Sequence, residues 1–356
     1  MPTFRTLTVV EAVASRPGLQ RLVLDDSSRA EAITQLVGEI AVGDEVVVNT
    51  TAVDLGLGTG GWHFVQWNLA RRELVMPGGG HIMKLRYTGA QLDTGAAELA
   101  SASETVASEP AGLPCLGGVP VLVGSVHSQV GVAAAMIRSL DSHARVSYVM
   151  TDGAALPIVI SDLVAQLVDR GLLTGTITAG HAFGGDLEAV SVPSALQLAV
   201  EVQRADIVIC AMGPGVVGTA TTLGTSAVEA ASVLTVAHQL GARPVLMVRA
   251  SDGDGRERHA GISHHSLTAL ALTPVGVDVP CVQELAERLG DIGPHRRVLV
   301  ADAAVGGVAE VLDRFGVRVT TMGRGPVEDG LFFRTTAAAA AHAVHSRSEP
   351  VTVTTE

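Results

Sequence analysis

One segment of this sequence concentrates side chains that could act as acids, bases or metal ligands. Residues 251–266 read SDGDGRERHAGISHHS and contain three histidines, two aspartates and two arginines. Histidine beside an orienting carboxylate is a common acid–base pair, and the same residue types bind divalent metals. The spacing HxxxxHH matches no established metal motif, and a solvated surface loop would explain the charges equally. Because three histidines fall within seven residues, we favour a catalytic role for Asp252, His259 and His264, with the metal and any cofactor unidentified.

A second segment, residues 207–226, leads from an apolar strand into closely spaced glycines and threonines. Its GPGVVG motif has the GxGxxG spacing of a dinucleotide-binding loop. The following helical pattern begins only at Ser226, and no acidic residue ends the next strand, which argues against a dinucleotide. The open alternatives are a cradle for a phosphate or carboxylate and a turn that packs closely against its neighbour. The ligand-binding residues expected for the cradle are Gly213, Gly215, Gly218, Thr219, Thr221 and Thr222.

Polar residues after other apolar runs offer further chemistry. His127 could act as an acid or base, while Ser128 beside it fits a helix cap. Asp152 is either a carboxylate in the site or half of an Asp-Gly turn. Arg324, in the segment GRG, could hold an anionic substrate or form a salt-bridged turn before the last helix.

The elements that must position these residues alternate between strand and helix from residue 115 to residue 345. This alternation predicts a Rossmann-like α/β domain with a doubly wound, mostly parallel sheet. Strands are expected at 121–124, 145–150, 173–179, 207–211, 244–249, 277–280, 297–301 and 317–320. Helices are expected at 130–140, 158–171, 193–204, 226–240, 266–271, 282–289, 305–315 and 332–344. Ligands bind outside the carboxyl ends of such strands, so the candidate residues should meet at one edge of the sheet.

The first 90 residues follow a different pattern, in which short β-prone runs are separated by glycine-rich turns. Strands are expected at 19–24, 45–49, 63–67 and 81–87. These runs predict a small antiparallel β-barrel-like domain. Residues 91–114 are poor in large apolar side chains and predict a linker, and residues 346–356 predict a disordered tail.

Composition narrows the range of partners. The 356 residues carry a formal charge of −12 and only two Trp, two Tyr and six Phe, which argues against nucleic acid and against anionic membranes. Lys84 is the only lysine, so there is no Walker-type phosphate loop. Three scattered cysteines and no apolar run of about 18 residues predict a cytoplasmic protein. A hydrophobic fraction of 47% suggests a homo-oligomer.

Four segments resemble a family of uncharacterised proteins, a domain of unknown function, from Gram-positive bacteria. They are NTTAVDLGLGTGGWHFV (49–65), GHIMKLRYT (80–88), TDGAALPI (151–158) and GRGPVEDGLFFR (323–334). The resemblance runs along nearly the full chain and implies a bacterial, cytoplasmic protein. It transfers no catalytic residues, because the family has no established activity.

Two functional hypotheses remain open. The first is an enzyme, a hydrolase or transferase, that acts on a small anionic metabolite at the carboxyl edge of the sheet. The second is a non-catalytic regulatory protein that binds a nucleotide or metabolite there. Five histidines distinguish the two hypotheses: His127, His181, His259, His264 and His265. The enzyme is favoured if at least two of them converge with a carboxylate within reach, and it fails if they point apart and outward.

Overall fold

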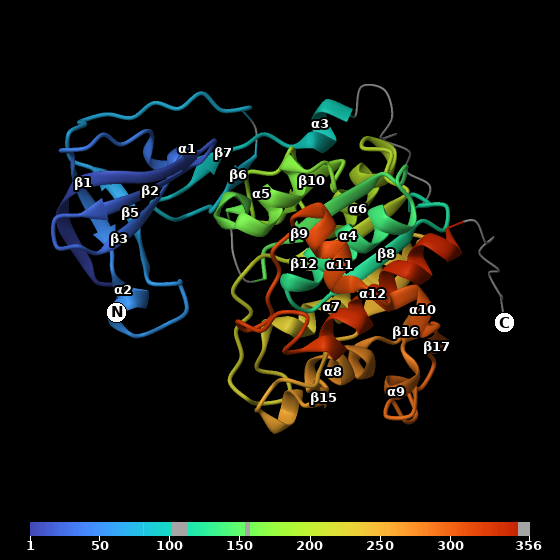
Figure 1. The fold of residues 1–356 in the computed structure, drawn as a ribbon. Coiled ribbons are helices and arrows are strands. Elements are labelled where there is room, and N and C mark those ends of the chain that lie inside the picture. Colours follow the sequence, from blue (N-terminus) through green and yellow to red (C-terminus); the bar gives the residue numbers. More distant parts are fainter. Residues whose placement is uncertain (81, 102–112, 154–156, 348–356) are drawn as a thin grey trace. The chain divides into compact units, whose positions relative to one another are not determined.

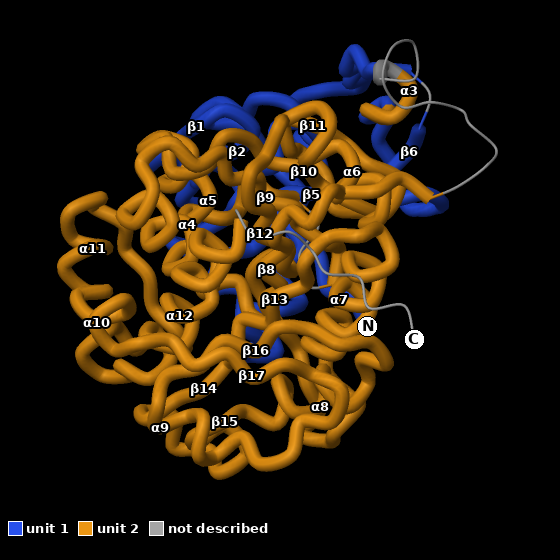
Figure 2. Tube along the Cα trace, turned by 90° about the vertical axis from the view of Figure 1, so that its right-hand side faces the viewer, with its two compact units in different colours: residues 1–95 blue, residues 96–356 orange. Residues whose placement is uncertain are grey.

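The computed structural model describes residues 1–80, 82–101, 113–153 and 157–347. The chain divides into two compact units, residues 1–95 and 96–356 (Figure 1, Figure 2). The stretch predicted as a linker contains strand β7 (Leu92–Asp93) and helix α3 (Ala97–Ser101). Its residues 102–112, and residues 348–356 of the predicted tail, lie outside the described residues. No helix within the described ranges combines the length and apolar character that crossing a bilayer requires.

The first unit is built on a closed five-stranded barrel. Its strands, in spatial order, are β1 (Phe4–Arg16), β2 (Leu19–Leu24), β3 (Arg29–Ile33), β5 (Trp62–Asn68) and β4 (Glu45–Asn49). Four pairings are antiparallel, and β3 pairs with β5 in parallel. The predicted small barrel is therefore confirmed, with a mixed rather than a purely antiparallel sheet. Short helices α1 (Thr34–Val37) and α2 (Thr51–Asp54) connect its strands.

The strand expected at 81–87 is reduced to β6 (Met83–Lys84), which pairs with β7. Leu85 and Tyr87 adopt left-handed backbone conformations with φ of 50° and 62°. This geometry ends the extended chain. His81 lies outside the described residues.

The second unit is organised around an eight-stranded sheet in which all strands run parallel. The spatial order is β11 (Leu187–Ala189), β10 (Gly175–Ala179), β9 (Val146–Thr151), β12 (Ile207–Met212), β8 (Pro120–Gly124), β13 (Arg243–Met247), β16 (Asp278–Cys281) and β17 (Arg296–Leu299). Every residue of β8, β9, β10 and β12 is buried. Continuous apolar runs are typical of parallel strands covered on both faces, which is why the sequence predicted them.

Helices cover both faces of this sheet, as expected of a doubly wound fold (Figure 2). On one face, α4 (Ser128–Leu140) packs against α5 (Asp162–Asp169), α11 (Val308–Phe315) and α12 (Gly330–Ser346). On the other, α7 (Glu229–Gln239) packs between α6 (Val192–Glu201) and α8 (His264–Leu272). The shorter α9 (Gln283–Ala286) and α10 (Asp302–Val305) lie near β17 and α12, respectively.

In this unit two predicted elements were wrong in extent or type, and strand β11 was missed. The helix expected at 158–171 is a 3₁₀ turn, η1 (Ile158–Ile160), followed by α5, because the Ser161 Oγ accepts from the Val164 N–H and starts a new helix. The strand expected at 317–320 is irregular chain that joins no sheet among the described residues. Strand β11, which pairs with β10, was not expected.

A buried amide joins two strands at the carboxyl edge of the sheet. The Gln129 Oε1 accepts from the N–H groups of Ser125 (3.0 Å) and Val126 (3.3 Å), and its Nε2 donates to the Met247 carbonyl (2.8 Å). Gly124, which ends β8, makes room for this side chain: a Cβ there would lie 2.8 Å from the Met247 Cε and 3.2 Å from the Gln129 Oε1. Gln129 thus fixes the end of β8 to the end of β13.

We expect Gln129→Ala to lower the free energy of unfolding by about 2–4 kcal/mol, because it leaves three buried backbone groups without a partner. Urea unfolding followed by circular dichroism would measure this. Gln283→Ala is the matched control, because that amide bonds only the exposed Glu287 on the same helix; its effect should stay within about 0.5 kcal/mol. Equal effects of the two substitutions would contradict the role assigned to Gln129.

Candidate functional site

The chain leaves two neighbouring strands in opposite directions at the centre of the sheet. Strands β8 and β12 pair directly. After β8 the chain passes through α4 to β9, on one side of this pair, and after β12 it passes through α7 to β13, on the other side. Such a topological switch point opens a crevice between the loops that follow the two strands, where ligands of open α/β sheets bind. The loops after β8, β12 and β13 all end in this region.

Two cavities occupy this edge of the second unit. The histidine cavity, of about 160 Å³, is lined by His259, His264 and His265 together with residues of the loop after β12. The neighbouring cavity, of about 300 Å³, is lined by His127 and by residues of the segment 318–322. Val216, Arg249 and Met322 line both, so the two cavities adjoin at these side chains.

Arg249 is a buried charge at the point where the cavities meet. It follows β13 directly, is 4% exposed, and its Nη1 donates to the Nδ1 of His265 over 2.9 Å. Burial lowers its pKa to about 10, with Arg256 acting in the same direction, so it remains charged at neutral pH. Among the described residues no carboxylate forms an ion pair with it. Asp254, which attracts it electrostatically, is bonded to other arginines.

Three histidines converge beside Arg249. The ring centroids of His259, His264 and His265 lie 4.4 to 5.1 Å from one another. His259 sits on the 3₁₀ turn η3 (Glu257–His259), and the other two form the first turn of α8, which Ser263 caps. The His259 Nδ1 bonds the Ser263 Oγ over 2.8 Å. Within the described part of the chain, the buried Nε2 of His264 has no hydrogen-bond partner.

All three histidines are held in the neutral form. Burial, followed by the Arg249 charge, lowers the pKa of His259 to about 4 and that of His265 to about 3. Burial and then Arg258 lower the pKa of His264 as well. Neutral imidazoles can accept a proton or bind a metal, whereas the positive charge of this region comes from its arginines.

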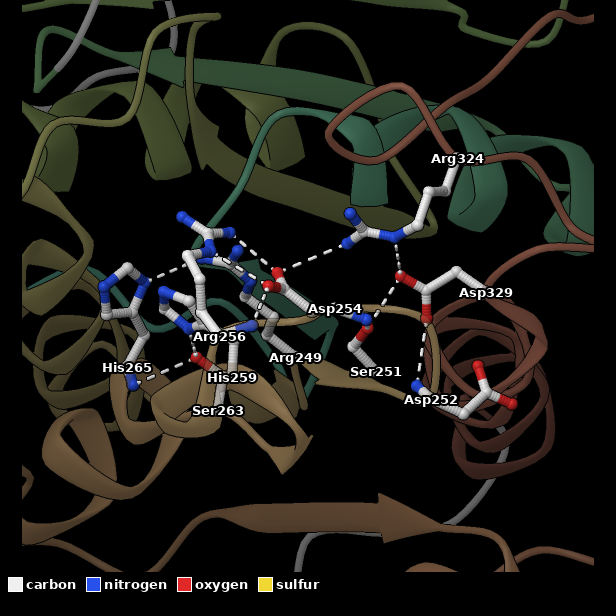
Figure 3. A network of polar contacts seen from close by, with 10 residues as sticks. All are labelled: Arg249, Ser251, Asp252, Asp254, Arg256, His259, Ser263, His265, Arg324 and Asp329. Atoms are coloured by element: carbon white, nitrogen blue, oxygen red, sulfur yellow. Dashed lines mark hydrogen bonds and ion pairs between the residues drawn. The ribbon is translucent and has the colours of Figure 1, made fainter.

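Two aspartates neutralise the other arginines of the region (Figure 3). Asp254 accepts from the Arg256 Nε (2.9 Å) and Nη2 (2.7 Å) and from the Arg324 Nη2 (3.2 Å). Asp329, fully buried, accepts from the Arg324 Nε (2.9 Å) and from the Ser251 Oγ (2.7 Å). This network ties the loop after β13, which contains β14 (Ala250–Ser251) and β15 (Gly261–Ile262), to the start of α12.

Two residues predicted for the site are bonded within or beside this network. The Asp252 carboxylate accepts from the Leu331 N–H (3.2 Å) at the start of α12 and is turned away from the histidines (Figure 3). Arg324 forms the salt-bridged turn that was its alternative interpretation. It is absent from the described lining of both cavities, and its predicted contact with an anion stays a prediction.

The threonine hydroxyls of the glycine and threonine loop bond mainly within the loop. The Thr219 and Thr221 hydroxyls bond each other (2.9 Å), and they also bond the carbonyl and the N–H of Gly224. Gly218 and Thr221 line the histidine cavity, and Gly215 lines the neighbouring one. The other three residues predicted for the anion cradle are absent from the described linings of both cavities; they are Gly213, Thr219 and Thr222.

The other predicted catalytic residues lie apart from the histidine cluster. The His127 Nε2 bonds the Ser161 Oγ (2.7 Å) and its Nδ1 bonds the Met212 carbonyl (3.3 Å). Asp152 accepts from the backbone N–H of His181 (2.9 Å). Three of the five histidines therefore converge, so they do not point apart. The charged group bonded to one of them, His265, is a guanidinium instead of the carboxylate that would favour the enzyme hypothesis.

Several lining residues were missed from the sequence. Arg249 was read as the last residue of an apolar strand, although a single charge ending such a run was a usable signal. His265 was considered with the other histidines of its segment but was not assigned a role in the site. Arg258 lines the histidine cavity and Arg318 the neighbouring one, and no pattern in the sequence distinguishes them from surface arginines.

Because burial lowers the pKa of several histidines, we expect the protein to lose stability in mild acid. Burial lowers the pKa of His127 to about 4 from its ordinary 6.5. Below pH 6.5 the unfolded chain therefore binds a proton that the native state does not, and the free energy of unfolding falls until about pH 4. Each such histidine contributes up to about 1.4 kcal/mol per pH unit. Urea titrations should show a shallower decline for His127→Gln than for the unmodified protein, and identical slopes would contradict this assignment.

Comparisons with known proteins agree with the resemblance seen in the sequence. The family model described as "Protein of unknown function (DUF3866)" matches residues 29–340, which cover β3, β4 and β5 of the barrel and the whole parallel sheet with nearly all of its helices. Searches of curated proteins and of solved structures returned no match. With most of its length matched by that model, the chain belongs to the family of proteins of unknown function DUF3866.

Proposed function

We propose that this protein is an enzyme, a hydrolase or transferase, that binds a small anionic metabolite in the two adjoining cavities. The observation that carries the proposal is Arg249: a buried guanidinium, shared by both cavities, with no carboxylate partner among the described residues. The ligand's anionic group would supply the missing partner.

The energetic argument concerns the desolvation of the guanidinium. A buried charge without a counter-charge costs several kcal/mol, and proteins ordinarily pair it. Here both aspartates of the loop are already bonded to Arg256 and Arg324. An anion with two or more oxygens, a phosphate or a carboxylate, fits the planar fork of a guanidinium. Arg258 and Arg318, at the walls of the two cavities, add positive charge that would attract it.

The cavity sizes favour a small ligand. The histidine cavity of about 160 Å³ is below the usual range of metabolite sites, and the neighbouring one of about 300 Å³ is at its lower limit. We assign the anionic group to the region around Arg249 and the body of the metabolite to the neighbouring cavity. A full dinucleotide exceeds this space. This agrees with the sequence argument that the loop containing GPGVVG does not bind a dinucleotide.

When no metal is bound, His264 is the group best suited to proton transfer. It is neutral at pH 7 because burial lowers its pKa, and its Nε2 has no partner in the described structure. A neutral imidazole can take a proton from water or from an acceptor hydroxyl, which is the step that hydrolysis and group transfer share. The acidic composition, the sparse cysteines and the family resemblance lead us to propose a bacterial, cytoplasmic homo-oligomer that binds neither nucleic acid nor membranes.

The binding test compares two arginines by calorimetry with inorganic phosphate and with citrate. We expect Arg249→Met to weaken binding of the preferred anion at least tenfold while the melting temperature stays the same or rises, because the substitution removes a buried unpaired charge. Arg314→Ala on α11 removes an equal charge outside both linings and should leave binding unchanged. The preferred anion identifies the phosphate or carboxylate class. Undiminished affinity in Arg249→Met would refute the anion site.

Turnover separates the enzyme from the regulatory alternative. In the metal-free protein we expect slow hydrolysis of p-nitrophenyl phosphate or p-nitrophenyl acetate, with kcat lowered about 10²–10⁴-fold in His264→Gln while phosphate affinity stays within a factor of three. Release of p-nitrophenol measures both. Anion binding at Arg249 without turnover of either ester would favour the non-catalytic metabolite-binding protein.

A further inference from the structure

We infer that His259, His264 and His265 form a binding site for a divalent transition metal of the Zn²⁺ class. Each residue offers one ring nitrogen, and the three nitrogens lie within 4.8 Å of one another. Three histidines with an open fourth position are a known ligand set for catalytic zinc. The site concerns imidazole nitrogens only, and it does not depend on whether the adjoining cavities bind an anion.

The rings are already close to a coordinating arrangement. Tetrahedral zinc with Zn–N bonds of about 2.0–2.1 Å places its ligand nitrogens roughly 3.4 Å apart. From the present separation of up to 4.8 Å, the nitrogens must therefore approach one another by up to about 1.4 Å, which side-chain rotation can supply. Two of the rings come from the first turn of α8 and the third from η3, so backbone hydrogen bonds hold all three near their positions.

The hydrogen bonds around the rings leave the right nitrogens available. If the His259 Nδ1–H donates to the Ser263 Oγ, which is 2.8 Å away, the Nε2 lone pair faces outward, as in many metal sites where a second contact fixes the tautomer. The His264 Nε2 is buried with no partner in the described chain. A buried polar atom without a partner is costly and calls for a physical explanation, and a metal ion provides one.

His265 links the metal to Arg249. Its Nδ1 now accepts from the Arg249 Nη1 over 2.9 Å, so this nitrogen carries a lone pair directed at a cation. A bound metal would take over that lone pair and leave the guanidinium without a protein partner. The guanidinium would then be free to bind an anion beside the metal.

The charge balance predicts that metal and anion bind cooperatively; this coupling, unlike the metal site, rests on the proposed function. Three neutral imidazoles leave the ion with its full double charge, and the charge of Arg249 repels it. An anion in the fourth coordination position would offset both. Phosphate should therefore tighten metal binding, and the metal should tighten phosphate binding by the same factor.

The test of the metal site uses the full-length chain after treatment with EDTA and dialysis. We expect one Zn²⁺ to bind per chain by calorimetry, and Co²⁺ to develop the visible absorption of a tetrahedral nitrogen-ligated site. His264→Gln and His259→Gln should each weaken Zn²⁺ binding at least 100-fold. His238→Gln removes an exposed histidine on α7 and should bind as the unmodified protein does.

The melting temperature of each variant checks its fold. A folded His264→Gln variant that retains the full Zn²⁺ affinity overturns the metal site, as does the absence of stoichiometric binding by the unmodified protein. An equal loss in His238→Gln overturns it too, because it would show diffuse binding to surface histidines.

Repeating the Zn²⁺ titration with inorganic phosphate tests the coupling separately. We expect phosphate to raise Zn²⁺ affinity at least tenfold in the unmodified protein and to have no effect in Arg249→Met, which should still bind Zn²⁺. Zn²⁺ binding that is indifferent to phosphate in the unmodified protein overturns the coupling and leaves the metal site standing. Phosphate binding without Zn²⁺ binding overturns the metal site and leaves the proposed anion site standing.

Discussion

The carboxyl edge of the sheet depends on the buried amide of Gln129. It satisfies two N–H groups that follow β8 and a carbonyl at the end of β13. This is possible because Gly124 has no side chain where the amide must pass. A central strand of a doubly wound sheet ends among unpaired backbone groups, and burying them without partners would be costly. With those groups satisfied, the loops after β12 and β13 can close over the end of β8, where the two cavities adjoin.

The distribution of charge at this edge is uneven for a physical reason. Asp254 and Asp329 neutralise Arg256 and Arg324 and, in doing so, anchor the loop after β13 to α12. No carboxylate pairs with Arg249 within the described chain, and burial keeps the neighbouring histidines neutral. The result is a small site with a fixed positive charge and three unprotonated imidazoles. Anion binding, proton transfer and metal binding all draw on this combination, which is why the proposals centre on the same few residues.

Much of the fold could be predicted from the chain itself. Buried parallel strands show as continuous apolar runs, and the helices between them show as amphipathic patterns, so the doubly wound sheet was foreseen. The failures have local causes. Strand β11 has three residues, too few for a pattern. The left-handed backbone at Leu85 and Tyr87 ended a segment that alternates like a strand. At Ser161, a side-chain cap divided what looked like one helix.

The sequence by itself determined that polar and histidine-rich segments follow strands of a parallel sheet and must gather at one edge. Only the tertiary structure decided which of them face one another. Asp252 and Arg324 have the right chemistry, yet contacts with residues close in space bind both elsewhere: Leu331 lies 79 positions from Asp252, and Asp254 lies 70 positions from Arg324. The sequence contains many arginines and does not indicate which of them has no carboxylate partner. That is settled when the chain folds, because the pairing of charges depends on distances between segments that the order of residues does not contain.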